Sequence, residues 1–250
     1  MSNIIIPFRA NLESGCVAAP LSNTKSIIFD GTDDYVDCGS ASYLNGLTEF
    51  SISVWFNLST AANNKCILAD WNYNSSPFGH FALGTTGTTG TAFKLQWFIK
   101  ATSDIGNNYT TTQAAICTEA TWHNVVATFN AGALKIYVDG VEAPNQTAGA
   151  IPTALTTQDG NLNIGRFPGL GRNWDGNIDE VSIYNTDQNK NIDCIYNGGV
   201  PTDLTNLNPI SWWRMGDLVT AFPTIPDVIG TNDGTAFNEP ESTMIVPDVP

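Results

Sequence analysis

The stretch that decides the fold is WHNVVATFNAGALKIYVDGVE, residues 122–142. Apolar residues recur at every second position in both of its halves: Val125, Ala127 and Phe129 in the first, then Leu134, Ile136 and Val138 in the second. Successive side chains of a strand point to opposite faces, so this period of two predicts two half-buried strands. The short link at residues 130–133 predicts a hairpin, and the dipeptide Asp139-Gly140 predicts the next tight turn. The stretch therefore reads as a β-meander.

The rest of the chain is consistent with a large β domain. Hydrophobic residues make up 42% of the 250 residues and charged residues only 14%, so the solvent-facing positions must be filled largely by small polar residues, which suit strands and turns. About a dozen short strand patterns occur, and one helix is expected near residues 187–197, with Thr186 as its N-cap and Gly198 as its stop. These patterns predict an all-β, two-sheet antiparallel jelly-roll sandwich. We expect residues 1–24 to form an arm or edge strand and residues 25–250 a single domain.

The charge balance excludes two classes of partner. The net charge is −14, with only 10 lysines and arginines. Nucleic-acid binding needs clustered cations, which the sequence lacks, and an anionic membrane surface would repel the chain. No apolar stretch is long enough to span a bilayer.

The cysteines and the N-terminus favour a reducing compartment. The five cysteines are odd in number and widely spaced, so we expect free, mostly buried thiols. The N-terminal segment has no signal-peptide pattern, and we expect the protein to be made in a cytoplasm.

Several stretches resemble a known family. TEFSISVWFNL, WHNVVATFNAGALKIYVDGV and NLNIGRFPGLGRNWDGNIDEVSIYN are similar to successive signatures of the laminin-G-like, concanavalin A-like lectin and glucanase jelly rolls. SIIFDGTDDYVDCG resembles the strand pair that precedes them, so the resemblance covers residues 26–198. It implies the jelly-roll fold but not one function, because this fold serves lectins, adhesins, glycosidases, lyases and virus coat proteins.

One element stands out of its usual order. The resemblance implies that a WW-containing strand and a GNDGT-like strand precede the strand that ends in FDG, which is SIIFDG at residues 26–31 here. In this chain the similar segments SWWRMGD and PDVIGTNDGTAFN follow it instead, at residues 211–238. We infer either that the sandwich is circularly permuted or that residues 201–250 complete the sheet of a neighbouring subunit.

The pattern of acidic and histidine residues argues against catalysis. Retaining glucanases of this fold place two glutamates on one strand, with carboxylates about 5 Å apart. The seven glutamates contain no such pair within a predicted strand, and the chain has only two histidines. The sequence contains no G-x-S-x-G motif and no cysteine–histidine arrangement that would indicate a nucleophilic catalytic residue. We therefore expect a protein that is not an enzyme.

Calcium is the metal that the acidic residues would suit, and no other cofactor is expected. The segment DGTDDYVD groups four aspartates, including Asp30, but lacks the spacing of a calcium-binding loop. The resemblance implies a structural calcium held by a carboxylate of the last-strand motif, which is Asp179 here. The candidate ligands are thus Asp179 and Asp30. The alternative is that Asp179 caps a turn or pairs with an arginine.

Loop residues offer a set of candidate glycan contacts. Aromatic rings can stack on the apolar faces of sugars, while amides and charged groups bond to hydroxyls. The candidates are Trp71, Tyr73, His80, Asn107, Tyr109, Arg166 and Trp174. The alternative for each tryptophan is a lid on the core, and for Arg166 an ion pair.

The predicted function rests on the fold and on the compartment in which we expect the protein to be made. The segment WWRMGD and the VPDVP end resemble predicted structural proteins of marine bacteriophages. The sequence thus favours a non-enzymatic virion protein, as capsid decoration, fibre or tail-associated jelly roll. Its partners would be other virion proteins, copies of itself and host-surface glycans. The alternative is a stand-alone, extracellular carbohydrate-binding lectin or adhesin.

Overall fold

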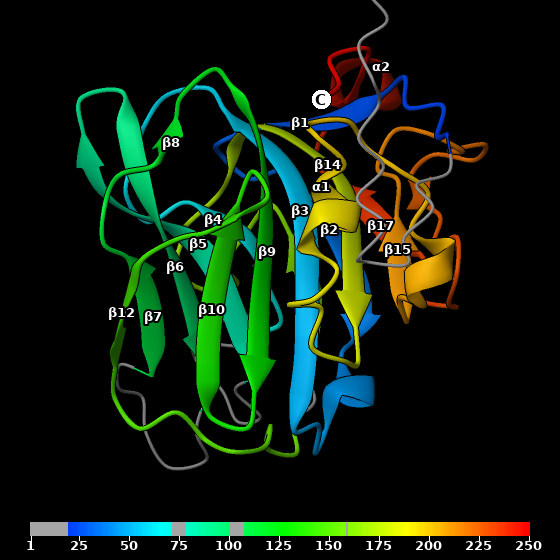
Figure 1. The fold of residues 1–250 in the computed structure, drawn as a ribbon. Coiled ribbons are helices and arrows are strands. Elements are labelled where there is room, and N and C mark those ends of the chain that lie inside the picture. The colour runs from blue at the N-terminus through cyan, green and yellow to red at the C-terminus, as the bar shows by residue number, and fades with distance from the viewer. Residues whose placement is uncertain (1–19, 72–78, 101–107, 159) are drawn as a thin grey trace, which may run out of the picture.

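The computed structural model describes residues 20–71, 79–100, 108–158 and 160–250, which form two antiparallel sheets packed face to face (Figure 1). The smaller sheet contains, in spatial order, β11 (Val141–Glu142), β10 (Ala133–Val138), β9 (Trp122–Asn130), β3 (Glu49–Leu58), β14 (Asp175–Tyr184), β1 (Ser26–Asp30) and β18 (Ile245–Val246), with β15 (Ser211–Trp213) beside β14. The larger sheet contains β12 (Asn145–Ala148), β7 (Tyr109–Thr112), β6 (Ala92–Ile99), β5 (Phe81–Thr89), β4 (Cys66–Ala69), β13 (Asn161–Ile164), β2 (Tyr35–Ser40), β17 (Gly234–Phe237) and β16 (Thr224–Ile225), with β8 (Cys117–Thr118) beside β6. The predicted all-β sandwich is confirmed.

The predicted meander at residues 122–142 is also confirmed. Strands β9 and β10 pair from Asn130↔Ala133 to Val125↔Val138. Ala131 and Gly132 between them both have positive φ, 44° and 95°, which is the backbone that a two-residue hairpin turn requires. Asp139 and Gly140 repeat this geometry at 49° and 80° and lead into β11.

The main core lies between the two sheets and is rich in aromatic rings. Phe50 of β3 illustrates it: its ring centroid lies 5.5 Å from that of Phe81 and 5.4 Å from that of Trp97, both on the larger sheet. All three side chains are fully buried. Burying one large apolar side chain contributes about 1.5–3 kcal/mol relative to its exposure, so such contacts hold the two layers together.

The outer face of the smaller sheet is buried too, which the sequence did not predict. The polar and small residues that alternate with the core positions of β9 and β3, such as Asn124, Thr128 and Ser53, are less than 3% exposed. A second apolar cluster covers this face with Ile192, Ile195, Leu204 and Trp212. The prediction of half-buried strands is therefore wrong for β9, because a later part of the chain folds over its second face.

The helix is shorter than predicted. Helix α1 covers only Ile192–Tyr196, with Asn191 rather than Thr186 at its N-cap, while Asn197 in the left-handed region ends it ahead of Gly198. The carboxylate of Asp187 accepts the backbone N–H of Asn189 at 3.0 Å, and this local turn competes with helix at residues 187–191. A second short helix, α2 (Glu241–Met244), was not expected. Two 3₁₀ turns, Ser42–Leu44 and Thr205–Leu207, complete the helical elements of the described residues.

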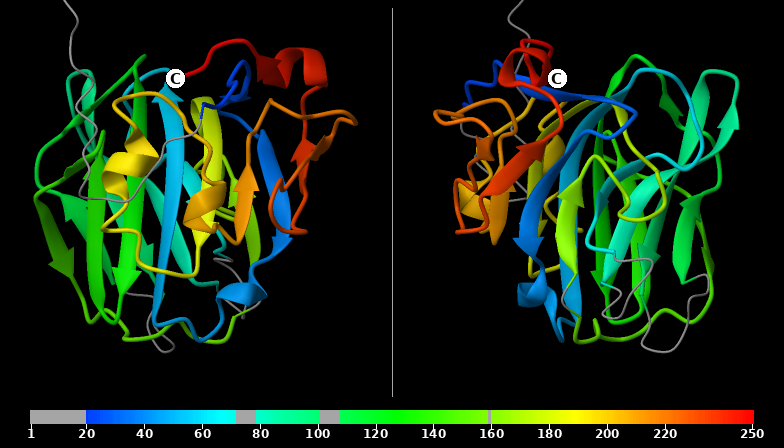
Figure 2. Two further views of the ribbon diagram at one scale, coloured as in Figure 1. Left: turned by 45° about the vertical axis from the view of Figure 1, so that its right-hand side comes forward. Right: turned by 180° about the vertical axis from the view of Figure 1, so that it is seen from behind.

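The displaced C-terminal segment joins both sheets of its own chain. Strand β15 pairs with β14, β17 pairs with β2, and β18 pairs with β1. Figure 2 shows the result: the last residues, in red, lie beside the first described strand, in blue. Of the predicted arm at residues 1–24, only residues 20–24 are described, and Pro20 forms a bridge to Thr202.

The cysteines differ in part from the prediction of free thiols. Cys38, Cys66 and Cys117 are free and buried. Cys194 of α1, however, is disulfide-bonded, so the prediction is wrong for this residue. In the part of the chain that the structure describes, no helix is long and apolar enough to cross a membrane.

Candidate functional site

A row of side chains on the outer face of the larger sheet forms the candidate site. Cross-strand pairing places Tyr109 opposite Phe98, Phe98 opposite Ala82, and Ala82 opposite Ala69. The row continues through Asn163 and Asp37 to Thr235. Directly opposed residues of paired strands point to the same face, so this row crosses the sheet on the side away from the main core.

Aromatic rings concentrate along this row, and we call the set the aromatic face: Tyr35, Trp71, Phe98, Tyr109, Phe167 and Phe237. Phe98 and Tyr109 have centroids 5.1 Å apart, and Trp71 lies 5.7 Å from Phe167. Tyr35 stacks on Phe237 at 4.6 Å and an interplanar angle of 7°. Apart from Phe167, which is 7% exposed, all of these residues are partly or largely open to solvent.

A chain of polar groups runs beside the rings. The Asn161 amide donates to both oxygens of Asp37 at 3.2 and 3.1 Å. The Asn163 amide donates to the Asn161 carbonyl at 2.8 Å, and Arg166 Nε donates to Asn163 Oδ1 at 3.0 Å. The Arg166 guanidinium also lies 3.2 Å from the centroid of the Tyr35 ring. These contacts fix amide, carboxylate and guanidinium groups at one end of the aromatic face.

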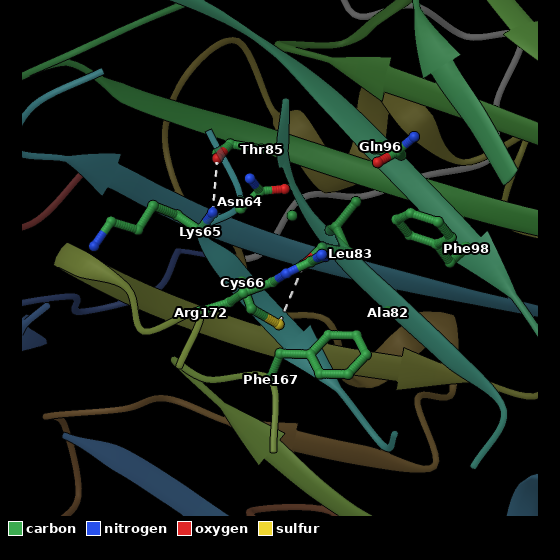
Figure 3. Close-up of a pocket in the computed structure, with 11 residues that line it drawn as sticks. Asn64, Lys65, Cys66, Ala82, Leu83, Thr85, Gln96, Phe98, Phe167 and Arg172 are labelled. Carbon is green, nitrogen blue, oxygen red and sulfur yellow. Dashed lines mark hydrogen bonds between the residues drawn. The ribbon is translucent and has the colours of Figure 1, made fainter. Parts of the chain in front are cut away.

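A shallow hollow lies near the middle of this face (Figure 3). Residues of β4, β5 and β6 line it, among them Cys66, Ala82 and Gln96, while Phe167 and Arg172 come from the loop between β13 and β14. Its open space is ≈ 270 Å³. This volume includes space that is open to solvent, so the hollow is too shallow to enclose a ligand and suits contact with one surface of it.

The structure brings three of the predicted glycan contacts to this face. Trp71 contacts Phe167, and the Lys100 amine lies 5.5 Å from the Trp71 ring centroid. Tyr109 and Arg166 belong to the row and to the polar chain described above. Among the described residues neither Arg166 nor Arg172 forms an ion pair with a carboxylate; they lie against the rings of Tyr35 and Phe167 instead.

Two other candidates are contradicted because their side chains are buried. Trp174 is 0% exposed, with its ring edge-on to Phe56 and its Nε1 donating to the Asn177 carbonyl. It is thus a core residue, as the alternative interpretation held. His80 is likewise 0% exposed.

The His80 ring is bonded on both sides within the protein. Nδ1 bonds to Asp70 Oδ2, and Nε2 bonds to Asn45 Oδ1 at 2.8 Å. Burial raises the pKa of Asp70, although the hydrogen bonds from His80 lower it. The pair therefore links the segments around Asn45 and Asp70 and cannot contact a glycan. Tyr73 and Asn107 lie outside the described residues.

Sequence reasoning missed Tyr35, Phe98, Phe167 and Phe237. Phe98 carried a usable signal, since residues 93–99 alternate and the residues at 94, 96 and 98 must share the face opposite to the core. The stacking of Phe237 on Tyr35 carried none, because it depends on the pairing of β17 with β2, about 200 positions apart.

The two candidate metal ligands lie in different surroundings. Asp179 is 0% exposed; its Oδ2 accepts from the Asn23 amide at 2.7 Å and its Oδ1 from the Glu180 N–H at 2.9 Å. Burial, together with the charge of Glu180, raises the pKa of Asp179 well above its ordinary value. Asp30, by contrast, is exposed and lies in a group with Asp34 and Glu239, the three offering oxygens within 4.8 Å of one another.

Comparisons with known proteins agree with this fold. The family profile described as the concanavalin A-like lectin/glucanases superfamily (Laminin_G_3) matches residues 30–190. No curated protein sequence matches the chain.

Two solved structures have similar folds. A heptameric SAP-like pentraxin from Limulus polyphemus is 14% identical with a TM-score of 0.57, over 73% of this chain and 88% of that one. A protein from Bacteroides ovatus ATCC 8483, titled "putative carbohydrate binding protein", is 18% identical with a TM-score of 0.62, over 88% of this chain and 59% of that one. At these identities the likeness establishes the fold alone.

Proposed function

Because the chain belongs to the concanavalin A-like lectin/glucanases superfamily, we propose that it is a carbohydrate-binding protein that uses the aromatic face of its larger sheet. The observation that carries this proposal is the cross-strand row that runs from the partly exposed rings of Tyr109 and Phe98, across β5, β4 and β13, to Asp37. The Asp37 carboxylate is held there by the exposed Asn161 amide, so the row has rings at one end and fixed polar groups at the other. The C–H faces of sugar rings pack on aromatic side chains, and sugar hydroxyls bond to amides and carboxylates. The aromatic face offers both kinds of contact, and they are adjacent at its Tyr35 end, where the Arg166 guanidinium lies on the ring.

The two outer faces of the sandwich support this choice of surface. The outer face of the smaller sheet is covered by α1 and by residues of the C-terminal segment, including Leu204 and Trp212. On the larger sheet the loop that holds Phe167 and Leu170 covers only a small apolar cluster. Among the described residues, the larger sheet thus keeps the more open and chemically more mixed of the two outer faces, and we place the ligand there.

Glycan-array screening followed by calorimetry tests the proposal. The wild-type chain should bind at least one glycan, and Trp71→Ala and Tyr109→Ala should each weaken binding at least tenfold, about 1.4 kcal/mol. Trp122→Ala is the matched control: this half-exposed tryptophan lies on β9 of the other sheet and bonds to Asp248 at 3.0 Å. Binding that is lost equally in the control, or kept in both face variants, would place the site elsewhere.

We also propose that the protein binds its carbohydrate ligand without catalysing a reaction on it. The adjacent carboxylates of the last-strand motif, Asp179 and Glu180, are at most 2% exposed, and Glu180 is bonded to Trp212 and Arg214. A buried carboxylate with these partners is not available to a glycosidic bond. A reducing-end assay on every polysaccharide that binds should remain at the blank, and a signal above it would contradict this proposal.

A virion role is a second proposal, which starts from the sequence resemblance of the WWRMGD segment. The structure adds one supporting observation. Four large hydrophobic side chains that remain exposed lie in the C-terminal part of the chain: Val200, Leu218, Ile229 and Phe237, which are 58, 57, 40 and 38% exposed. Contact with other subunits would remove these apolar side chains from water, which is favourable.

Proteomics of purified particles tests the virion proposal, and the protein should co-purify with them at a fixed ratio to the major capsid protein. A chain found only free in the medium would favour the alternative, a secreted lectin or adhesin. The disulfide at Cys194 suits that alternative, since disulfides persist in oxidising surroundings.

A further inference from the structure

The carboxylates of Asp30, Asp34 and Glu239 gather where the beginning and the end of the described chain meet. Asp30 ends β1, Asp34 precedes β2, and Glu239 follows β17, which pairs with β2. One oxygen of each residue lies within 4.8 Å of the others. Among the described residues none of the three forms an ion pair with a lysine, arginine or histidine.

The side chain of Asp34 gives independent evidence that this group of three carboxylates lacks a ligand. Its side chain is only 2% exposed, and its Oδ1 has no hydrogen-bond partner. Its other oxygen, Oδ2, accepts the N–H of Asp30 at 3.0 Å, which fixes the carboxyl group in place. Buried polar atoms nearly always have a partner, so an unpartnered carboxyl oxygen beside two further carboxylates indicates a missing ligand of positive charge.

The geometry suits a hard divalent cation. Calcium–oxygen distances are about 2.4 Å, so oxygens on opposite sides of one ion lie up to about 4.8 Å apart, the limit within which this group falls. Asp30 Oδ1 accepts the N–H groups of Thr32 and Asp33 at 2.7 and 3.3 Å, which holds this carboxylate at the turn after β1. A proton on Asp34 is the competing way to relieve the repulsion among three carboxylates.

We propose that Asp30, Asp34 and Glu239 form a divalent-cation site, with calcium as its ligand, that fastens the C-terminal segment to the loop between β1 and β2. The Asn238 amide, which donates to the carbonyl of Asp33, already joins the same two segments beside it. The site would be structural, and its three ligands are not members of the aromatic face.

Calcium titration of the chelator-treated full chain tests the proposal. Because calcium would bind only the folded state, a calcium concentration one hundred times the dissociation constant should raise the melting temperature by about 5–10 °C. Calorimetry should give one ion per chain. Asp34→Asn and Glu239→Gln should each abolish the calcium-dependent rise, whether or not they change the melting temperature in chelator.

Glu241→Gln is the matched control. It removes the same charge two residues away, in the first turn of α2, outside the group of three carboxylates. It should keep the full response to calcium. No response of the wild type to 10 mM calcium, or a response retained in both Asp34→Asn and Glu239→Gln, would overturn the proposal. Because stability is the readout, the result is independent of whether the protein binds glycans.

Discussion

Replacing Glu180 by glutamine should destabilise the protein, because this side chain ties the C-terminal segment to the sandwich. Glu180 is in β14 and is 2% exposed. Its Oε2 accepts from Trp212 Nε1 at 2.7 Å, and its Oε1 accepts from Arg214 Nε at 3.0 Å. An amide can accept only one of these two bonds, and its NH₂ group then faces the other donor.

The size of the effect follows from what remains bonded. Removing one partner of a buried ion pair costs about 3–5 kcal/mol, because the other charge is left unpaired. Arg214 keeps bonds to Asp217 at 3.1 Å and to the Ser22 carbonyl at 2.6 Å, so we expect the lower end, ~3 kcal/mol. In a chain of this size each kcal/mol lowers the melting temperature by about 2–4 °C, so the drop should be roughly 6–12 °C.

Thermal unfolding followed by circular dichroism measures the change, and Glu142→Gln is the control. That glutamate bonds to Lys135 at 3.0 Å, but the two side chains are 49 and 41% exposed, and exposed pairs contribute at most about 1 kcal/mol. Hydrogen exchange should also rise at residues 211–217 in Glu180→Gln alone. A Glu180→Gln melting temperature within 2 °C of the wild type would refute the reasoning that this contact holds the segment.

Two further predictions concern the turns and the pH dependence of stability. Gly140→Ala should lower the free energy of unfolding by roughly 2 kcal/mol in chemical denaturation, because φ is +80° and the added Cβ would lie 2.7 Å from the Tyr196 ring. Gly90→Ala, at φ +60° with open space around it, should lower the free energy of unfolding less. Equal losses in the two variants would contradict the role of the ring. Burial, then the nearby carboxylates of Asp30, Glu239 and Asp33, raise the pKa of Asp34 from 3.8 to about 6, so the folded, metal-free protein holds this proton more tightly than the unfolded chain. The stabilisation from protonated Asp34 is complete below pH 4 and is lost as the pH rises through 6. In chelator, the melting temperature of the wild type should therefore fall relative to that of Asp34→Asn between pH 4 and 7. Parallel curves of melting temperature against pH would show that Asp34 does not titrate there.

The sequence predicted those features that depend on neighbouring residues. The hairpin between β9 and β10 follows from alternation and a two-residue turn, both within residues 122–142. The aromatic character of the loops was also visible, and it placed Trp71 and Tyr109 among the candidates. The alternation in β6 could have added Phe98, because the core positions around it are strongly apolar.

What the sequence could not supply is contact between distant segments. Trp174 and His80 looked like exposed loop residues, but Trp174 packs on Phe56 and His80 bonds to Asn45, partners 118 and 35 positions away. The burial of the outer face of β9 depends on α1 and Trp212, which lie 60 or more positions beyond it. Periodicity describes which residues share a face, not what later covers that face.

The C-terminal segment connects the stability of the sandwich to its proposed binding surface. Strand β17 pairs with β2 and brings Phe237 onto the ring of Tyr35, the same ring that holds the Arg166 guanidinium. Glu239 follows two residues later at the carboxylate group, while Arg214 anchors the start of the segment on Glu180. Release of the segment would therefore uncover the edge of β2 and remove one ring from the aromatic face. The contacts that fasten residues 211–246 thus also maintain the shape of the surface at which we place the glycan.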